Sequence, residues 1–459
     1  MLESINIRDQ NHDSSRTVII SSFHVLIGRN IIGTPILDML ADHGIRVVIL
    51  VPDHKKKFFA RWYCGPRRVI EGVRPYLFAK KFSALFFKRL SRVMLDTETV
   101  RIRMEYKRYL QGKRFLYFFV FLPCRLLGRS RTLVRLVRGL DAALRPGRGY
   151  FQPLLDRYRP DMVIITDVIN ESDVALLQDA KEARIPTLGI ARSWDNLTNY
   201  LMRSVPDALI VANEIMKAQA IPYAGVDPDA IHIAGIPHYD RYLRGPEINR
   251  ADFFHEMGLD PARPLVLYAP VADHRIKNND IDAHVVAILA GTGYNIIVRM
   301  PPANPVRLDT AGVRPGVVFD VSGHSFYRKG DSELTHEDDE RLINELYYCN
   351  VVISGPGTMN IDAAVFDKPL ILVRFYPTPR TELEGIKEYG YTHIAPILQS
   401  GGVRIAGNGK ELLSLLEMYL ANPERDRAGR QRIVREQCFR LDGASSRRVA
   451  QFILKKLEL

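Results

Sequence analysis

A glycine-containing turn carries residue types that can bind a phosphate. The segment Ser354-Gly355-Pro356-Gly357-Thr358-Met359 follows the apolar run Val351–Ser354 and precedes a helical pattern. A strand that ends in such a turn and opens a helix directs backbone N–H groups and the positive end of the helix dipole at one point. Gly355 and Gly357 would let the backbone approach a diphosphate closely, and the Thr358 hydroxyl could add a hydrogen bond. The alternative is an ordinary strand–helix turn that Thr358 caps.

Basic side chains follow several other predicted strands in the same half of the chain. In parallel α/β sheets, ligands bind outside the carboxyl ends of the strands, where loops from different strands meet. The loops expected at that edge contribute Arg275, Lys277, Arg299, His324, Arg374 and Arg380. Each could be a solvated surface charge, but the set predicts a cationic pocket for a phosphorylated ligand. Asp362, on the helix after the turn, could reach ribose or sugar hydroxyls of that ligand, or could simply favour the helix N-terminus.

Carboxylates that could act as a general base lie in the first half of the chain. Asp167, Glu171 and Asp173 follow the apolar run 161–166, and Asp195 lies on the loop after the next run. Transfer to a hydroxyl needs a base within hydrogen-bond reach of that hydroxyl. Asp167 is the first catalytic candidate, Asp195 the second and Glu171 a further one. Each could instead cap a helix or lie on a solvated loop, and in a retaining transfer these acids would position the acceptor.

Two sheets are needed to position these residues. Short continuous apolar runs separated by helical patterns are typical of parallel strands that are buried on both faces. A single core stops growing near about 250–300 residues, so a chain of 459 residues predicts two domains. We predict an α/β protein with two doubly wound, Rossmann-like domains that face a central cleft. The expected domains are residues 1–243 and 244–459, and the last helix could cross back to the first. The predicted strands are 17–22, 46–51, 161–166, 187–190, 208–212, 265–268, 295–299, 351–354 and 370–373.

A basic segment of about residues 55–149 interrupts this alternation. The chain has 64 Lys+Arg and 52 Asp+Glu, a net charge of +12. Residues 55–148 hold 25 basic and 5 acidic residues, a net +20, so the remainder carries −8. Aromatic and aliphatic residues recur at helical spacing among these cations, as in Phe82, Phe86 and Leu90. The pattern predicts a helical, basic and amphipathic insert in the first domain.

Three uses of this insert stay open. Basic amphipathic helices bind an anionic membrane surface, because each cation near the headgroups contributes about 1 kcal/mol. The insert could instead be a structural cap with solvated arginines, or it could bind nucleic acid. The large content of Phe and Leu argues against nucleic acid, since a surface that follows phosphates does not need it.

Cysteines and targeting signals restrict the cellular setting. Cys64, Cys124, Cys349 and Cys438 are far apart and form no CxxC pair, which indicates reduced thiols rather than disulfides or a metal site. The polar N-terminus does not resemble a signal peptide. The longest apolar run, Phe115–Leu122, is far shorter than the ~20 residues of a membrane span. We expect a cytoplasmic protein that is peripheral on the inner face of the membrane, with no metal and no cofactor.

Several motifs of the second half occur in a known group of transferases. Gly235-Ile236-Pro237-His238-Tyr239-Asp240, Leu267-Tyr268-Ala269-Pro270 and the glycine turn followed by Asp362-Ala363-Ala364 and Lys368-Pro369-Leu370 appear in the order and spacing of that group. The chain resembles the GT-B glycosyltransferase superfamily, and within it the CDP-glycerol glycerophosphotransferases and bacterial surface-polysaccharide transferases. More distantly it is similar to UDP-N-acetylglucosamine 2-epimerases. The resemblance covers about 220 residues, from near Thr187 to the C-terminus. One departure is Met300-Pro301-Pro302, where relatives commonly carry a His-Pro pair.

This resemblance implies a metal-independent transferase that binds a nucleotide-activated donor in the second domain and an acceptor on the first. The donor would be a nucleotide-diphosphate or nucleotide-monophosphate sugar or polyol, and the acceptor a surface polysaccharide or a lipid-linked glycan. The alternatives are a hydrolysing nucleotide-sugar 2-epimerase and a non-enzymatic scaffold that binds membrane or nucleic acid. The residues assigned to donor binding are Arg275, Lys277, Arg299, His324, Ser354, Gly355, Gly357, Thr358, Met359 and Asp362.

Overall fold

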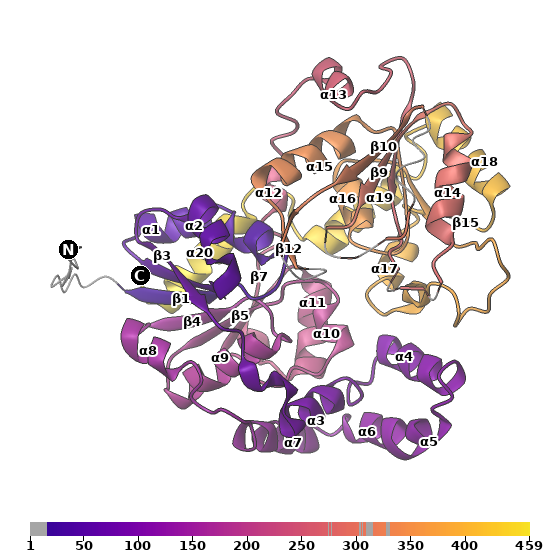
Figure 1. Ribbon diagram of the computed structural model, residues 1–459. Helices are drawn as coiled ribbons and strands as arrows, with labels where there is room; N and C mark the ends of the chain where they lie inside the picture. The colour runs from indigo at the N-terminus through magenta and orange to yellow at the C-terminus, as the bar shows by residue number, and fades with distance from the viewer. Residues whose placement is uncertain are drawn as a thin grey trace, which may run out of the picture.

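The computed structural model describes residues 16–273, 275–276, 278–302, 304, 306–308, 315–326 and 331–459. It has two parallel sheets with helices on both faces, one in each half of the chain, as predicted (Figure 1). Lys277 lies outside the described residues, so its predicted contact with a donor has no structural counterpart here.

The first sheet has seven parallel strands in the order β3-β2-β1-β4-β5-β6-β7. Its strands are β1 (Thr17–Ser21), β2 (Arg46–Pro52), β3 (Arg68–Val73), β4 (Met162–Ile165), β5 (Thr187–Ile190), β6 (Ala208–Val211) and β7 (Ile231–Ile233). Its helices are α1 (Ile36–Asp42), α2 (Lys56–Tyr63), α8 (Gln152–Tyr158), α9 (Glu171–Glu182), α10 (Asn196–Asn199) and α11 (Glu214–Gln219). Short helical turns are η1 (Gly28–Ile32), η2 (Asp53–Lys55), η5 (Ala220–Ala224) and η6 (Pro228–Ala230).

The second sheet has six parallel strands in the order β10-β9-β8-β13-β14-β15. Its strands are β8 (Leu265–Ala269), β9 (Asn295–Met300), β10 (Val317–Val321), β13 (Val351–Ser354), β14 (Leu370–Val373) and β15 (Arg404–Ala406). A separate antiparallel pair is formed by β11 (His324–Ser325) and β12 (Ser332–Glu333). The helices are α13 (Arg250–Glu256), α14 (Ile281–Ala290), α15 (His336–Tyr348), α16 (Met359–Val365), α17 (Ala395–Leu398), α18 (Gly409–Ala421) and α19 (Arg427–Cys438), with the turn η7 (Lys387–Gly390).

All nine predicted strands are present, and within the two parallel sheets the four strands that the sequence did not predict are the four edge strands; the antiparallel pair of β11 and β12 was not predicted either. β3 and β7 bound the first sheet, and β10 and β15 bound the second. The inner strands are buried almost throughout and are mostly apolar, whereas each edge strand is only partly buried and includes polar residues. An edge strand has one neighbour fewer, so its sequence lacks the uninterrupted apolar run by which the inner strands were found.

The basic insert is smaller than predicted. Because β3 pairs with β2 over six residues, the segment up to Val73 belongs to the first sheet, and the helical insert follows it. Its helices are α3 (Phe82–Ser91), α4 (Glu98–Tyr109), α5 (Arg114–Leu116), α6 (Leu122–Leu127) and α7 (Arg131–Ala143), with the turns η3 (Leu77–Lys80) and η4 (Tyr117–Phe121). They form an arm beside the first domain that reaches below the second domain (Figure 1). No helix in the described part of the chain has the length and apolar character that a membrane span requires.

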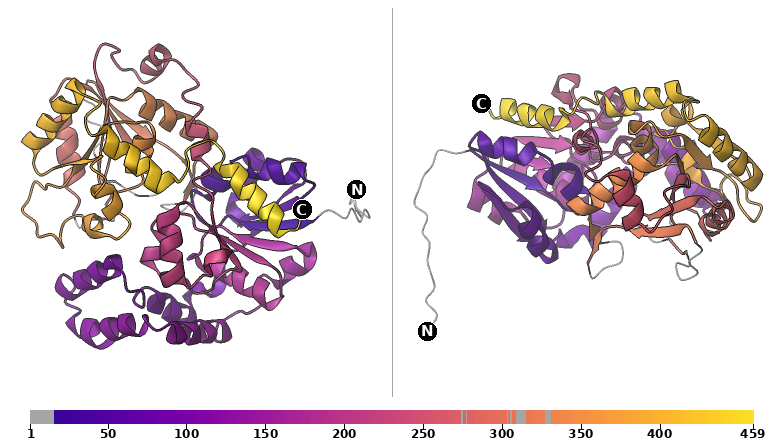
Figure 2. Two further views of the ribbon diagram at one scale, coloured as in Figure 1. Left: turned by 180° about the vertical axis from the view of Figure 1, so that it is seen from behind. Right: turned by 90° about the horizontal axis from the view of Figure 1, so that it is seen from above.

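Contacts on several sides hold the two domains together. Helix α20 (Ser445–Lys456) crosses back to the first domain, where Val449 and Ile453 join the core beneath β1 and β2 (Figure 2, left). The linker helix α12 (Tyr239–Tyr242) precedes the second domain, and its Asp240 accepts hydrogen bonds from the first two amides of α20, at 3.0 and 2.7 Å. On the opposite side, Lys55 of the first domain forms an ion pair with Glu333, at 2.8 Å. The cleft between the sheets is therefore bridged at both ends.

Helix α4 of the insert forms a further bridge between the domains. Its N-terminal Thr99 exchanges hydrogen bonds with Thr392 of the second domain, at 3.0–3.3 Å. Its Tyr106 ring lies 4.0 Å from the ammonium nitrogen of Lys387 in η7. The same helix is tied to the first domain, because Thr97, its N-cap residue, donates a hydrogen bond to the carbonyl of Thr198, at 2.7 Å. The insert therefore lies across one end of the cleft.

Candidate active site

A cavity of about 330 Å³ lies at the carboxyl ends of β1, β4 and β5 in the first domain. The three predicted catalytic acids, Asp167, Glu171 and Asp195, all line it. Helix α3 of the insert supplies another wall, so the cavity is built jointly by the Rossmann-like sheet and the insert. The remaining polar lining residues are His24, Lys88, Ser91, Arg92, Asn170, Arg192, Asn199, Tyr200 and Arg203.

Asp167 belongs to the floor of this cavity. Its side chain is 1% exposed, accepts a hydrogen bond from the amide of Ile169 and pairs with Nε of Arg192, both at 3.0 Å. Behind it, Asp173 is fully buried and accepts a hydrogen bond from Ser21. Burial, and then the charge of Asp167, raise the pKa of Asp173 well above its ordinary value. Asp167, the first-choice catalytic acid, thus forms part of a buried polar network.

Glu171 is also held by ion pairs. Both of its carboxylate oxygens accept hydrogen bonds from Nη1 of Arg203, at 2.8 and 2.9 Å, and Lys88 of the insert lies 3.4 Å away. Arg203 in turn forms a bidentate pair with Asp141 of helix α7, both bonds at 2.8 Å. Because two cations occupy the carboxylate, Glu171 fastens the insert to the sheet and is poorly placed to accept a proton from a substrate.

Asp195 lies where the cavity meets the second domain. It accepts a hydrogen bond from Asn199, at 2.7 Å. Burial by itself would raise the pKa of Asp195, but His393 and the hydrogen bond from Ser193 hold it below the ordinary value. Its neighbour Trp194 contacts the His393 ring edge to face, with centroids 5.0 Å apart. Of the three acids, Asp195 is therefore the one whose neighbour in the chain contacts the second domain.

The groups around His393 connect this acid to the glycine turn. Burial lowers the pKa of His393 to about 4; the charge of Asp195 opposes the decrease, whereas Arg275 and Arg103 reinforce it. Arg275 donates a hydrogen bond from Nη1 to the carbonyl of Pro356 within the turn. Through the contact of Trp194 with His393, the cavity of the first domain thus adjoins the second domain, which carries the predicted phosphate site.

The glycine turn is closely packed at Gly355 and exposes Thr358, while its predicted contact with a phosphate stays a prediction. A Cβ at Gly355 would lie 3.0 Å from Val271, and one at Gly357 would lie 3.5 Å from Arg275. Ser354 is buried and donates its hydroxyl to Asn360, at 2.7 Å, which braces the turn. Thr358 precedes helix α16, but its side chain makes no capping hydrogen bond and is exposed. The alternative of a turn simply capped by Thr358 is therefore wrong.

Two residues assigned to donor binding have other roles. Arg299 is 6% exposed, and its guanidinium pairs with Asp320 at 2.7 Å and with Glu345 at 2.9 Å, inside the second domain. His324 stacks on Phe58 of helix α2 with centroids 5.4 Å apart, so it belongs to the contact between β11 and the first domain. Arg299 is thus held by internal ion pairs and His324 by a ring contact with the first domain, and their assignment to a donor phosphate stays a prediction.

Two further donor candidates are partly buried by the fold. Asp362 of α16 is 6% exposed and accepts a hydrogen bond from the hydroxyl of Tyr242, at 3.1 Å; the same hydroxyl accepts one from Arg29, at 2.7 Å. Burial, opposed by the charge of Arg29, raises the pKa of Asp362. Met359 is half-buried and packs on the core of the second domain. Asp362 thus stabilises the domain junction, and its predicted contact with ribose is not supported.

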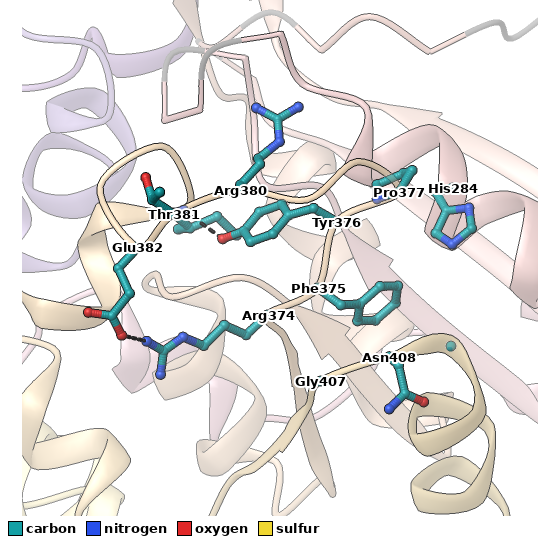
Figure 3. Close-up of a pocket in the computed structure, with 12 residues that line it drawn as sticks. His284, Arg374, Phe375, Tyr376, Pro377, Arg380, Thr381, Glu382, Gly407 and Asn408 are labelled. Carbon is teal, nitrogen blue, oxygen red and sulfur yellow. Dashed lines mark hydrogen bonds and ion pairs between the residues drawn. The ribbon is translucent and has the colours of Figure 1, made fainter. Parts of the chain in front are cut away.

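A second cavity, of about 560 Å³, lies at the carboxyl ends of β14 and β15, on the second domain alone (Figure 3). Arg374 and Arg380 extend from the loop above it, and His284 lies at its far side (Figure 3). Arg374 pairs with Glu382, and Arg380 with Asp280, both at 2.8 Å. These two arginines, predicted to converge on the glycine turn, instead belong to this separate cavity.

The residues of the candidate site that escaped prediction from the sequence include His24, Arg103, Arg192 and His393. His24 and Arg192 follow strands β1 and β5, so the rule that loops after parallel strands converge could have found both. Burial and the charge of Arg192 lower the pKa of His24, although Asp167 opposes this, so His24 is neutral at pH 7. His393 and Arg103 follow no strand, and only the tertiary structure brings them to the cleft.

One group of metal-ligand types occurs among the described residues, at Glu247, His336 and Glu340. The guanidinium of Arg241 already contacts both His336 and Glu340. A cation would compete with that guanidinium, so this group does not form a convincing metal site. It also lies outside both cavities described above.

Comparisons with known proteins agree with this architecture. A family model described as CDP-glycerol:poly(glycerophosphate) glycerophosphotransferase matches residues 191–455. No curated protein sequence matches the chain. Among solved structures, the chain is similar to a putative UDP-N-acetylglucosamine 2-epimerase from Listeria monocytogenes, with a TM-score of 0.57, 12% identity and 97% of each chain covered.

Two other solved structures share the fold. One is the UDP-GlcNAc 2-epimerase from Neisseria meningitidis bound to UDP-GlcNAc, with a TM-score of 0.57, 11% identity, and 96% of this chain and 100% of that chain covered. The other is the glycotransferase of kitacinnamycin, with a TM-score of 0.51, 11% identity, and 96% and 99% covered. At such identities these similarities establish the two-domain GT-B architecture and leave the chemistry to be argued from the site.

Proposed function

The chain belongs to the CDP-glycerol:poly(glycerophosphate) glycerophosphotransferase family, and we propose that this nucleotide-dependent transferase moves a glycosyl or polyol-phosphate group to a surface-polysaccharide or lipid-linked acceptor. The observation that carries the proposal is the contact of Trp194, next to Asp195, with His393 of the second domain, the domain in which Arg275 donates a hydrogen bond to the glycine turn. It joins an acid-lined cavity on one domain to a phosphate-type turn on the other, which a two-substrate transfer in a cleft requires.

The donor nucleotide binds at the glycine turn in this proposal. Backbone N–H groups of the turn, the free hydroxyl of Thr358 and the guanidinium of Arg275 are suited to its phosphates. Arg275 provides a cation at the turn, whereas Arg299 is held by its internal ion pairs. These donors would stabilise the negative charge of the departing nucleotide without a metal ion or other cofactor. Activity that survives exhaustive chelation would agree with this, and activity restored only by a divalent cation would contradict it.

Asp195 serves as the general base. It lines the acceptor cavity, and its neighbour Trp194 contacts the second domain, which binds the donor in this proposal. The acceptor hydroxyl gives its proton to Asp195 while its oxygen attacks the anomeric carbon of a sugar or the phosphorus of a polyol phosphate. The bond to the bridging oxygen of the donor breaks, and the nucleotide leaves as a diphosphate or a monophosphate, respectively. Asp167 and Arg192 shape the floor on which the acceptor rests.

The insert docks the enzyme on an anionic membrane surface. Most of the large apolar side chains that are exposed in the described part of the chain lie between Leu77 and Leu144. On α7 and just beyond, Leu136, Leu140 and Leu144 recur every four residues and are all exposed, which leaves one apolar stripe without a protein partner. Arginines on the same helices suit the headgroups beside such a stripe. This position would hold the acceptor cavity close to a lipid-linked acceptor.

Donor binding provides the direct test. Thermal shifts with CDP-, UDP-, GDP- and CMP-linked donors identify the nucleotide, and titration calorimetry then compares variants with the wild type. We expect Arg275→Gln and Thr358→Val each to weaken nucleotide binding, by about 10-fold or more for the charged group. Arg374→Gln is the matched control, because Arg374 lies in the separate cavity of the same domain. Binding that depends on Arg374 and not on Arg275 would move the donor to that cavity.

A further inference from the structure

The N-terminus of helix α4 lies between two segments of the candidate site, the loop that carries Asp195 and the segment that carries His393. Thr97 and Thr99, at the start of the helix, are 5% and 0% exposed. The first amides of a helix have no partner within the helix, so they bind groups from elsewhere. At the start of α4, groups from both domains surround this turn.

One side of the turn binds the loop that carries Asp195. Thr97 donates its hydroxyl to the carbonyl of Thr198, at 2.7 Å, and Thr198 donates its own hydroxyl to the carbonyl of Asp195, at 3.2 Å. The side-chain amide of Asn199 donates to the Asp195 carboxylate, at 2.7 Å, and the Asn199 carbonyl accepts from Arg103, farther along α4. Because both loop residues bond to α4 and to Asp195, the helix fixes the direction of that carboxylate.

The other side of the turn binds the segment that carries His393. The hydroxyl of Thr392 accepts hydrogen bonds from the amide and the hydroxyl of Thr99, at 3.3 and 3.2 Å. The Thr99 hydroxyl in turn accepts from the amide of Thr392, at 3.0 Å. A residue of the second domain therefore satisfies an amide at the start of α4. His393 is the next residue, and its ring packs on Trp194.

Packing along α4 reinforces these hydrogen bonds. A Cβ on Gly390 would lie 2.5 Å from Cδ1 of Ile102, so a side chain at residue 390 would have to displace Ile102. One turn farther on, the Tyr106 ring lies 4.0 Å from the ammonium nitrogen of Lys387. Contacts at helical spacing show that one face of α4 follows the segment 387–392.

We propose that α4 is a clamp for the reaction centre, in which Thr99 and Thr392 are positioning residues that act on Asp195 through His393 and Trp194. The inference rests on the proposed function and gives the insert a part in the chemical step, beyond its contact with a membrane. A general base has to stay within hydrogen-bond reach of the hydroxyl, and a displacement of about 1 Å can cost about 100-fold in rate. The clamp comes from a segment outside residues 191–455, which match the family model.

Thr99→Val tests the clamp, because it keeps the shape of the side chain and removes the hydroxyl that bonds to Thr392. We expect kcat to fall by at least about 10-fold, with nucleotide affinity and the KM of the donor within about twofold of wild type. Thr99→Ser keeps the hydroxyl and should restore most of the turnover. Thr132→Val is the matched control, since it makes the same change at an exposed position on α7. A kcat for Thr99→Val within about twofold of that control, at normal thermal stability, would overturn the proposal.

A spectroscopic measurement tests the same clamp without relying on activity. The chain has two tryptophans, Trp62 and Trp194, so the fluorescence of a Trp62→Phe protein reports on Trp194 alone. In that background, Thr99→Val should shift the emission to longer wavelength and increase quenching by iodide, because the His393 ring is no longer held on the indole. Thr132→Val should change neither quantity.

The two measurements separate this proposal from the proposed function. Identical emission and quenching with and without Thr99→Val would contradict the clamp, whatever the activity. A wild type without transferase activity would contradict the proposed function, and the fluorescence would still decide whether α4 positions the contact between the domains.

A second pair of variants covers the case in which Thr99→Val does not fold. Gly390→Val should displace α4 through Ile102 and lower kcat, whereas Ile102→Ala/Gly390→Val makes room for the new side chain and should recover part of the turnover. Circular dichroism establishes that both proteins are folded. A double variant no more active than Gly390→Val would show that the position of α4 does not control turnover, and the proposal would be wrong.

Discussion

The imidazole of His393 packs edge to face on the indole of Trp194, with ring centroids 5.0 Å apart and planes at 72°. The two residues come from loops on opposite domains, so this contact fixes Asp195, the next residue along the chain, at the junction of the two half-sites. The relationship changes the ranking of the catalytic acids, because Asp167 lies deeper and is bound to Arg192. In the proposed mechanism, the contact with the second domain, rather than the distance from a strand end, favours Asp195 as the base.

Asp195→Asn should reduce turnover by at least about 100-fold, the low end for the loss of a general base, while nucleotide affinity stays within about twofold of wild type. The amide preserves the size of the side chain but cannot accept the proton. Steady-state kinetics and titration calorimetry on the same preparation measure both quantities.

Asp167→Asn is the matched comparison for that variant. It should mainly lower stability, because it leaves the Arg192 guanidinium without its carboxylate at the cavity floor. Its turnover should fall clearly less than that of Asp195→Asn. A larger loss of turnover in Asp167→Asn, with normal thermal stability, would return the catalytic role to Asp167.

Arg299→Ala should lower the free energy of unfolding by about 3–5 kcal/mol, because it leaves the carboxylates of Asp320 and Glu345 buried without a cation. Urea unfolding followed by circular dichroism measures this. Arg341→Ala provides the control: Arg341 also pairs with Asp320 but is 44% exposed, so its loss should cost about 1 kcal/mol or less. A stable Arg299→Ala protein with weakened nucleotide binding would restore Arg299 to the donor site.

The stability of the protein should fall as the pH decreases from about 6.5 to about 4, because folded His393 stays unprotonated in this range. Burial lowers the pKa of His393 to about 4, whereas an unfolded histidine titrates near 6.5. Between these values the unfolded state binds the proton and the folded state does not. The free energy of unfolding is therefore unaffected by His393 above pH 6.5 and decreases as the pH falls from 6.5 towards 4. The shift corresponds to at most about 3 kcal/mol.

Unfolding in urea at a series of pH values, in wild type and in His393→Gln, tests this dependence. The free energy of unfolding of the variant should decrease less than that of wild type between pH 6.5 and pH 4. Identical pH profiles for the two proteins would mean that other groups, such as the carboxylates, account for the whole acid sensitivity.

Phe115→Ser/Phe119→Ser should weaken binding to vesicles of phosphatidylcholine and phosphatidylglycerol by about 10-fold or more, with little change in thermal stability. The two rings are 70% and 68% exposed and stack on each other at 4.6 Å, so they contribute apolar area to the membrane and little to the core. Flotation over a salt series measures the loss. This substitution is cleaner than deletion of the insert, which would also remove α4 from the cleft.

Val321→Ser is the control, since Val321 is 69% exposed but lies on the second domain. It should float like wild type. If the Phe115→Ser/Phe119→Ser variant bound vesicles as well as wild type does, the exposed apolar side chains would serve another purpose than membrane docking.

The amino-acid sequence determined the inner framework of both domains. Continuously apolar segments such as Asp161–Thr166 have few ways to bury themselves other than as central parallel strands, so both sheets and the loops at their carboxyl ends followed from local pattern alone. For the same reason the positions of the glycine turn and of the acids Asp167 and Asp195, each just beyond a strand, followed from the same pattern. The charge of the insert was equally a property of the sequence.

Only the tertiary structure decided which of these groups can act. Arg299 lies within β9 rather than beyond its end, so its side chain points from the face of the sheet to Glu345 instead of to the cleft. His393 and Arg103 reach the site because the domains close on one another and on the insert, and these contacts join residues that are far apart in the chain. Apolar runs in the sequence indicate which segments are buried. A functional site depends instead on the direction of each side chain and on contacts between domains, and neither of these produces a periodic pattern in the sequence.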